Sequence, residues 1–390
     1  MAYVFKQCSL VYSSSGLLRD VDILVHPDGR INIGEELAGE EKVPCKGLLV
    51  VHGFANLHTQ LTHYFYKREF LSRLNWSSHH DEPLPKESAI SLAVLSLYNT
   101  LETGTTLIVD ASLYAEEISV HAGKIGLNYI ISARWPKKEV SKGKVILIDN
   151  FDSIEEDLED LREYQEKAKA FLMIHVSNSK EQVFGFKRRK GRYPIEYLYM
   201  KNLLGSRTIL ISPAWLTSWE LSLLAETETR IVQAPIAGLY TGEGLLPHEQ
   251  LRNRGVTPAL CSESPSLGLT LDMLEQLKTY YLFQRGFFEN IDYTISDAYV
   301  SATSAGYNTL MFEGGEIRDG AKADLLFYSL EELSLPTYQD ANLLFFGLNT
   351  KSLEYVVVNG QIIFSPEKKQ EILAEKRRLI EKLMDQEVLG

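Results

Sequence analysis

A short apolar run that ends in alternating polar residues constrains the fold of this chain most strongly. In residues 48–60, four apolar residues and a histidine precede Gly53, and polar side chains follow it. An apolar run of this length, bounded by a turn residue, is typical of a strand buried on both faces. Because side chains alternate along a strand, His58 and Gln60 are expected to share one face. Polar groups at the carboxyl end of a buried parallel strand occupy the position where barrel enzymes carry their chemistry.

Strand-like and helix-like segments alternate from about residue 48 to residue 314. The clearest strand-like runs are residues 106–110, 128–132, 170–175, 208–212, 230–234 and 257–261, with helical patterns between them, for example at residues 88–101, 153–169 and 218–226. Such alternation predicts parallel strands joined by crossover helices. With a first strand near residue 48 and a weaker one near residues 289–300, the pattern predicts a (β/α)8 barrel. An open doubly wound sheet is the alternative, but no glycine-rich phosphate loop follows the first strand.

The two ends of the chain carry further strand-like runs. Residues 1–47 contain several short runs separated by turn signals, which are too few to bury a core alone. Near the other end, two apolar runs flank Asn359 and Gly360, a dipeptide that favours a two-residue hairpin turn. The last residues are rich in Glu, Lys and Leu, which predicts an amphipathic helix.

Charge and cysteine content limit the possible partners. The chain has 40 Lys and Arg against 52 Asp and Glu, and this net charge of −12 argues against nucleic acid or an anionic membrane as a partner. No apolar run approaches the roughly 18 residues that span a bilayer, and the first residues lack a signal-peptide pattern. Cys8, Cys45 and Cys261 are too few and too scattered to predict a disulfide framework or a cysteine zinc site. We therefore expect a soluble cytoplasmic protein with a small-molecule ligand.

The chain resembles the amidohydrolase superfamily, and most closely the branch that contains chlorohydrolases, guanine deaminases and related aminohydrolases. The residues that carry the resemblance are 53–58 of the first predicted barrel strand and the segments 101–110, 221–227, 242–247 and 320–325. The resemblance implies a barrel at residues 49–314 and a composite β-sandwich formed by residues 1–48 and 315–364. Residues 365–390 would add a C-terminal helix. Because many relatives pair through the barrel, it also implies a homodimer.

In the family, histidines and an aspartate hold a divalent metal ion at one end of the barrel, and a glutamate transfers protons. The positions that match this set are His58, Gln60, His175, Asn178, Ser212 and Glu263. His58 and His175 keep two of the histidines, whereas Gln60 and Ser212 replace two others. Asn178 stands in place of the glutamate, and Glu263 in place of the aspartate. Glu181, three residues beyond Asn178, is a weak substitute for the proton-transferring group.

These replacements leave the activity open between alternatives. In the first, His58, His175 and Glu263 bind one divalent ion (zinc, iron or manganese), and Glu263 and His175 are catalytic. The protein would then hydrolyse a non-peptide C–N bond of a small cyclic or heteroaromatic compound. In the second, it is a metal-free, inactive relative that binds a small molecule or a partner. Amides and hydroxyls are poor ligands for such ions, and Asn178 exchanges no proton near neutral pH. Metal-independent chemistry by Glu263 is a third possibility.

Further residues are candidates for a substrate pocket. The full set of pocket candidates is His58, Gln60, Asn178, Ser212, Trp76, Arg134, Trp135 and Trp215. Tryptophan rings stack on flat heterocycles, and an arginine can pair with an anionic group. Core packing is the alternative role for the tryptophans. Trp76 belongs to the polar segment 68–85, which we expect to cover the site as a loop. Asp110, at the end of a predicted strand, is expected to be structural.

Overall fold

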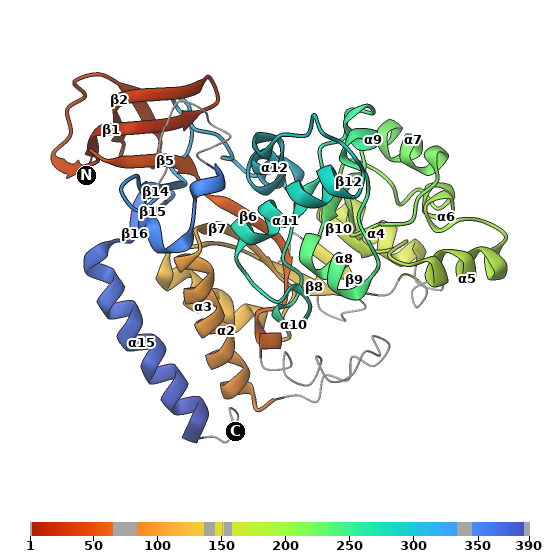
Figure 1. Ribbon diagram of the computed structural model, residues 1–390. Helices are drawn as coiled ribbons and strands as arrows, with labels where there is room; N and C mark the ends of the chain where they lie inside the picture. Colours follow the sequence, from red (N-terminus) through yellow and green to blue (C-terminus); the bar gives the residue numbers. More distant parts are fainter. Residues whose placement is uncertain are drawn as a thin grey trace.

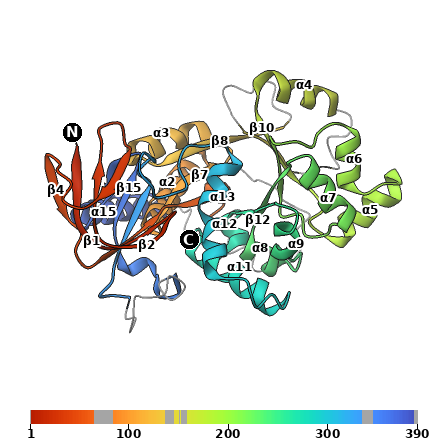
Figure 2. The same ribbon diagram turned by 90° about the horizontal axis from the view of Figure 1, so that it is seen from above.

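The fold is organised around two sheets of eight strands each. This computed structural model describes residues 2–64, 84–135, 145–149, 151, 158–333 and 345–385. One sheet combines strands from both ends of the chain, and the other is built of parallel strands from its middle. The two sheets lie next to each other, and the long helix α15 (Pro366–Asp385) runs along α2 (Lys86–Glu102) beside the first sheet (Figures 1 and 2).

The parallel sheet confirms the predicted (β/α)8 barrel. Its strands are β6 (Phe54–Thr59), β7 (Thr105–Asp110), β8 (Asn128–Arg134), β9 (Val145–Ile148), β10 (Phe171–His175), β11 (Thr208–Ile211), β12 (Arg230–Gln233) and β13 (Ala259–Leu260). Each strand pairs with the next one along the chain. Apart from β8, in which several residues are half-buried, the strands are short and almost fully buried, as expected for parallel strands covered by helices on the outside.

The outer helices follow the strands in the expected alternation (Figure 2). Besides α2 they are α3 (Ala115–Ile125), α4 (Leu158–Ala168), α5 (Lys180–Lys190), α6 (Pro194–Met200), α7 (Ser218–Glu226), α8 (Pro235–Thr241), α9 (His248–Arg252), α10 (Pro265–Gly268), α11 (Met273–Gly286), α12 (Ile295–Ala302) and α13 (Ser304–Thr309). Among the described residues, no helix is long and apolar enough to cross a bilayer.

Hydrogen bonds between β6 and the residues after β13 close the barrel. Ser262 and Asn56 exchange two bonds: the Ser262 N–H donates to Asn56 Oδ1 at 3.0 Å, and Asn56 Nδ2 donates to Ser262 Oγ at 2.7 Å. One step further, the Glu263 N–H donates to the His58 carbonyl at 3.1 Å, and Thr59 Oγ1 donates to the Glu263 carbonyl at 3.0 Å. The closure therefore joins the backbone of His58 to that of Glu263.

The prediction of a strand near residues 289–300 is wrong, because this region contains helix α12. The helix begins with a capping box in which Thr294 Oγ1 and the Asp297 side chain each accept a bond from the other's backbone N–H. This reciprocal capping specifies a helix start. The missing barrel strand is β9, a buried run of four apolar residues that is too short to be conspicuous in the sequence.

The composite sheet contains strands from both chain ends. Its members are β1 (Tyr3–Ser13), β2 (Gly16–Val25), β3 (Ile31–Gly34), β4 (Glu41–Pro44), β5 (Leu48–His52), β14 (Leu325–Ser329), β15 (Leu353–Val358) and β16 (Gln361–Phe364). Strand β5 lies between β1 and β14, so it joins the two ends of the chain. The predicted hairpin turn connects β15 to β16, with φ of 49° at Asn359 and 76° at Gly360, as a type I′ turn requires.

The chain passes from one sheet to the other at Gly53. The apolar residues before it form β5, whose last residue His52 pairs with Leu325 of the composite sheet. The barrel strand β6 starts only at Phe54, so the sheet change falls later than the expected boundary at residue 48. The His52 ring fixes this junction: Nδ1 lies 2.8 Å from the Gly53 carbonyl, and Nε2 accepts the Gly315 N–H at 2.9 Å. Burial lowers the pKa of His52 to about 4, so the ring is neutral at pH 7.

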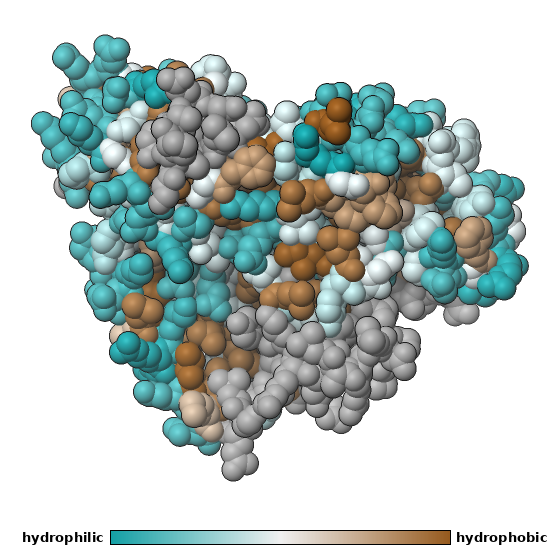
Figure 3. Space-filling view, in the orientation of Figure 1, coloured by the Kyte–Doolittle hydropathy of each residue, from teal (hydrophilic) through white to brown (hydrophobic). Residues whose placement is uncertain are grey.

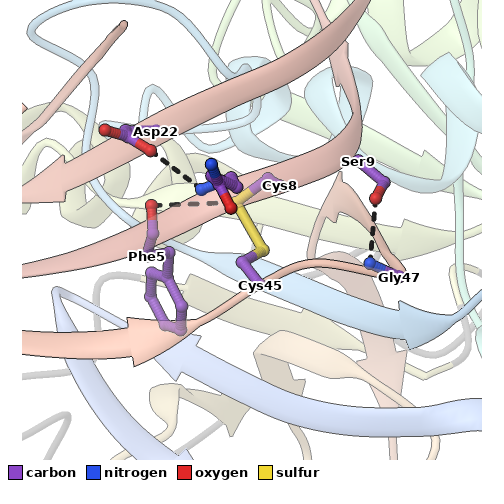
Figure 4. The surroundings of a disulfide bond; sticks show 7 residues. Phe5, Cys8, Ser9, Asp22, Cys45 and Gly47 are labelled. Atoms are coloured by element: carbon purple, nitrogen blue, oxygen red, sulfur yellow. Dashed lines mark hydrogen bonds between the residues drawn. A yellow bond between two sulfur atoms is a disulfide. The ribbon is translucent and has the colours of Figure 1, made fainter. Parts of the chain in front are cut away.

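A disulfide joins Cys8 of β1 to Cys45, which follows β4 (Figure 4). This bond was not predicted from the sequence, in which the two cysteines are 37 positions apart. Parallel pairing of β1 with β4 brings them together, and the Cys45 N–H donates to the Lys6 carbonyl at 2.9 Å. Cys261 is a free, buried thiol.

Reduction of this disulfide is expected to destabilise the composite sheet. A crosslink across a loop of this length stabilises a fold by about 3–4 kcal/mol, chiefly by restricting the unfolded chain. A reducing agent should therefore lower the unfolding midpoint of the wild type in urea, and Cys45→Ser should lower it to a similar extent. Cys45→Ser should show no further loss on reduction, whereas Cys261→Ala should keep the reductant effect. An unchanged midpoint in the reduced wild type would contradict a stabilising crosslink.

Candidate metal centre at the barrel mouth

Three potential metal ligands meet at the barrel mouth, by which we mean the carboxyl ends of the barrel strands. His58 lies on β6, His175 is the last residue of β10, and Glu263 follows β13. The Nε2 atoms of the two histidines are 3.3 Å apart. Glu263 Oε2 is 3.4 Å from His58 Nε2, and Glu263 Oε1 is 3.9 Å from His175 Nε2. All three residues therefore direct a ligand atom toward the same point.

Their inward direction follows from the strands that carry them. Met173 and Cys261 belong to the core inside the barrel, so His175 and Glu263, two residues further on, continue the inward series. Leu57 also belongs to this core, and strict alternation would turn His58 outward. The pairing of β6 with β7 is irregular between Asn56 and Thr59, however, and this irregularity turns His58 toward His175. The orientation of His58 toward the other two ligands therefore depends on a local irregularity in β6.

The three ligand residues lie close enough together to share one divalent ion. Bonds of roughly 2.1 Å at the tetrahedral angle separate neighbouring ligand atoms by about 3.4 Å. The two histidine Nε2 atoms match this value at 3.3 Å, whereas Glu263 approaches them through different oxygens, Oε2 at 3.4 Å from His58 and Oε1 at 3.9 Å from His175. With one ligand atom from each residue, the three atoms lie within 4.8 Å of one another. Imidazole nitrogens and a carboxylate are ligands that zinc and similar ions accept. The replacement of the family's aspartate by Glu263 thus leaves a donor set that fits a metal ion.

The electrostatic surroundings keep the His175 imidazole in its neutral form. Burial lowers the pKa of His175, and the charge of Glu263 opposes this shift only in part. A histidine must be neutral to donate a lone pair to a metal. His58 is fully buried, and its Nδ1 has no hydrogen-bond partner among the described residues.

Gln60 and Ser212, which replace two family ligands, and Asn178, which replaces the proton-transferring glutamate, differ in their surroundings. Gln60 Oε1 is buried and has no hydrogen-bond partner within the described parts of the chain. Ser212 Oγ accepts the Ala234 N–H at 3.2 Å. Asn178 Nδ2 donates to the carbonyls of Ile211 and Ser212 at 3.0 and 3.1 Å. Ser212 and Asn178 thus hold the end of β11 in place, whereas Gln60 keeps an unused acceptor.

The remaining pocket candidates lie at separate places. Trp215 is 37% exposed, and the Lys180 ammonium group lies 4.4 Å from the centre of its ring. Arg134, the last residue of β8, pairs with Asp149 at 3.3 Å. Trp135 packs against Tyr164 of α4 in the core between the barrel and its outer helices. Trp76 and most of the segment 68–85 lie outside the described residues.

Asp110 has the structural surroundings expected for it. Its Oδ1 accepts bonds from the Leu61 N–H, the Ser112 N–H and Ser112 Oγ at 3.1, 3.1 and 2.7 Å. Its Oδ2 accepts a bond from the Tyr129 hydroxyl. Asp110 is fully buried, and burial raises its pKa although these bonds oppose the shift. With all these donors, Asp110 ties the end of β7 to β8 and to the segment after β6.

Glu243 is a half-buried acidic residue that was not among the candidate site residues predicted from the sequence. It lies in the loop between α8 and α9, which follows β12. Burial raises the pKa of the Glu243 carboxyl to about 7, and the charge of Glu263 adds to the shift. The sequence contained one indication of this residue: it is a carboxylate in a loop that follows a predicted barrel strand, where barrel enzymes carry site residues.

Comparisons with known proteins agree with this architecture. The sequence profile of the amidohydrolase family matches residues 148–363, which is more than half of the chain. The 5-methylthioadenosine/S-adenosylhomocysteine deaminase of Thermococcus sibiricus is 24% identical over 93% of this chain and 94% of its own length. An adenosine deaminase from Xanthomonas campestris, solved with bound zinc, superposes with a TM-score of 0.84 at 16% identity, covering 98% of both chains. Zinc-complexed atrazine chlorohydrolase from Arthrobacter aurescens superposes with a TM-score of 0.83 at 16% identity, covering 97% of this chain and 100% of the other. The family match and the architecture together show that this chain belongs to the amidohydrolase family.

Proposed function

We propose that this protein is a hydrolase that removes an amino group from an aromatic heterocycle in a small nucleoside-like molecule. The observation that carries the proposal is the convergence of two imidazole nitrogens and a carboxylate, from His58, His175 and Glu263, within 4.8 Å of one another. The relatives support the substrate class, because the Thermococcus and Xanthomonas proteins are named as deaminases of adenosine compounds. In such a reaction, water adds its oxygen to a ring carbon and ammonia leaves, so a C–N bond is hydrolysed.

In this proposal, His58, His175 and Glu263 hold one divalent ion. An ion bound there supplies Lewis acidity and lowers the pKa of a water molecule. The chain contributes a fixed geometry: the Glu263 N–H bonds to the His58 carbonyl, so two of the ligands cannot move apart independently. Burial of His58 and Glu263 keeps bulk water away from the ligand atoms.

The pocket residues have assigned roles in the same proposal. The buried Gln60 Oε1 atom, which has no partner among the described residues, accepts a hydrogen bond from an N–H group of the substrate. Without the substrate, this oxygen stays without a partner, which is unfavourable for a buried polar atom. Trp215 offers an exposed ring face at the mouth for a flat heterocycle. Arg134 is assigned to an anionic group of the substrate through its position at the end of β8.

The sequence predictions of a homodimer and of a cytoplasmic location remain proposals. Apolar side chains gather in the middle of one face, over α8 and α11 (Figure 3). Leu239, Leu282 and Phe287 are 42%, 64% and 68% exposed. Contiguous exposed apolar groups are typical of surfaces that pair, and this supports a homodimer that forms through the barrel.

The cytoplasmic location is opposed by one observation. The Cys8–Cys45 disulfide counts against a reducing compartment such as the cytoplasm.

The test is metal-dependent release of ammonia. Protein stripped of metal and then loaded with zinc, manganese or iron is assayed against adenosine, 5′-methylthioadenosine and 5′-deoxyadenosine. We expect turnover of at least one adenosine compound, abolished by a chelator and restored by the ion. Absence of turnover on the whole panel after loading with each ion would refute the proposal.

Binding without hydrolysis is the second candidate function. The observation that favours it is the Asn178 amide, whose donors are engaged by the carbonyls of Ile211 and Ser212 and which transfers no proton. Calorimetry with the same adenosine compounds separates the two candidates. Saturable heat without ammonia release would assign the protein to this second class.

A further inference from the structure

Asp149, the first residue after β9, lies beside the metal ligand His175. Strands β9 and β10 are parallel neighbours, and their register pairs Ile148 with Ile174. The same register, carried one residue further, places Asp149 opposite His175. Neighbouring strands in a sheet are about 4.8 Å apart, so the two backbones are close at this level. Asp149 therefore belongs to the rim of the barrel mouth.

The alternation of side chains along β9 directs Asp149 into the mouth. Val145 and Leu147 belong to the core inside the barrel, so Asp149, two residues beyond Leu147, continues this inward series. The charges around His175 agree with this direction. Burial lowers the pKa of His175, and the charge of Asp149 is one of those that oppose the shift. The strand pattern and the register therefore lead to the same position as the charge effect.

Arg134 holds the Asp149 carboxylate at this position. It is the last residue of β8 and is paired with Leu147 of β9. Its Nε atom lies 3.3 Å from Asp149 Oδ2, and this is the only ion pair of Asp149 among the described residues. The side chains of Arg134 and Asp149 are 32% and 44% exposed, so a molecule in the mouth can reach them. The pair thus presents a fixed, accessible carboxylate next to the metal centre.

The charge of this carboxylate limits what it can bind. Asp149 lies outside the ligand cluster found among the described residues. A carboxylate accepts hydrogen bonds and donates none. Because the guanidinium group of Arg134 already balances its charge, a cationic group gains little there, whereas neutral hydroxyl groups can donate to it. Acidic side chains bind the hydroxyl groups of ribose in this way.

We propose that Asp149 recognises the ribose of the nucleoside-like substrate by accepting hydrogen bonds from its 2′- and 3′-hydroxyl groups. This inference rests on the proposed function, because it needs a substrate with a sugar. In an adenosine compound, the amino group to be removed is at the metal centre, and the ribose is attached to the other ring of the purine. The sugar hydroxyls therefore lie beyond the ligand cluster, where the rim carries Asp149. Two neighbouring hydroxyl groups match the two oxygens of one carboxylate.

The test measures kcat/KM for adenosine and for 2′,3′-dideoxyadenosine, which lacks both hydroxyl groups. For the zinc-loaded wild type, we expect adenosine to be preferred about 100-fold, as for two hydrogen bonds to a charged group. In Asp149→Asn this preference should fall at least about tenfold, while the affinity for zinc stays unchanged. The matched control is Asp160→Asn, which alters an exposed carboxylate in the first turn of α4 and should keep the preference of the wild type. A purely structural role would lower kcat/KM for both nucleosides alike and leave the preference unchanged.

The outcomes separate this inference from the proposed function. If the zinc-loaded wild type turns over both nucleosides with kcat/KM values within about threefold, or if Asp149→Asn keeps the preference of the wild type, Asp149 does not bind the ribose and the hydrolase stands. If the wild type releases no ammonia, the proposed function fails, and calorimetry compares the dissociation constants of the same nucleosides. A preference for adenosine that is lost in Asp149→Asn would then support the inference for a binding protein. Equal affinities, or no binding of either nucleoside, would overturn it.

Discussion

Glu263→Gln is expected to lower the affinity for zinc at least about 100-fold. The substitution keeps the size of the side chain but replaces a charged carboxylate by a neutral amide at a distance of 3.4 Å from His58 Nε2. Loss of a partner outside the ligand shell already costs 10–100-fold in metal affinity, so loss of a direct ligand should cost more. Isothermal titration of the metal-free protein with zinc measures the effect.

Glu181→Gln is the matched control for this experiment. It removes an equal charge from the first turn of α5, and Glu181 does not belong to the ligand cluster. Its zinc affinity should equal that of the wild type. A wild type that binds no zinc, or a Glu263→Gln variant that binds it equally well, would contradict the metal centre and leave ligand binding without hydrolysis as the better description.

The convergence of His58, His175 and Glu263 could be predicted from the sequence for a simple reason. Each follows or ends an apolar run that forms a strand, and in a parallel barrel all such ends meet at one mouth. To predict that these residues meet, it is enough to know that each belongs to a strand and that the strands run in the same direction. The number of residues between them in the sequence does not matter. The same reasoning explains why the hairpin at Asn359 and Gly360 was predictable, since its turn chemistry is local.

The features that escaped prediction depend on contacts between distant segments. Cys8 and Cys45 meet only because β1 pairs with β4. The loop that contains Glu243 is joined to the segment after β11 by the bond from Trp215 Nε1 to the Glu243 carbonyl. In residues 48–59, the pattern alone shows one continuous strand, whereas the sheet change at Gly53 is imposed by the neighbours of that residue.

Gly53→Ala is expected to destabilise the protein by about 3 kcal/mol or more, or to prevent folding. A Cβ atom on Gly53 would lie 2.1 Å from Thr106 Oγ1, 2.3 Å from its Cγ2 and 2.7 Å from its Cβ. Rotation of the Thr106 side chain cannot relieve the last contact. Thr106 itself is fully buried, and its hydroxyl lies 3.0 Å from the Tyr307 hydroxyl, which donates to Asp324 at 2.6 Å. Urea unfolding followed by circular dichroism measures the loss.

Gly123→Ala is the matched control, because a Cβ atom at this position in α3 meets no atom within 4 Å. It should keep or raise stability by up to about 1 kcal/mol, as expected for alanine in a helix. Equal stability of Gly53→Ala and the wild type would mean that Thr106 of β7 is not in close contact with Gly53.

The same substitution should also affect the metal centre. Since Gly53 directly precedes β6, any displacement that accommodates the new methyl group also moves His58 relative to His175. A Gly53→Ala protein that does fold should therefore bind zinc more weakly than the Gly123→Ala protein, because the same close approach that joins the two sheets also places the first ligand of the metal centre.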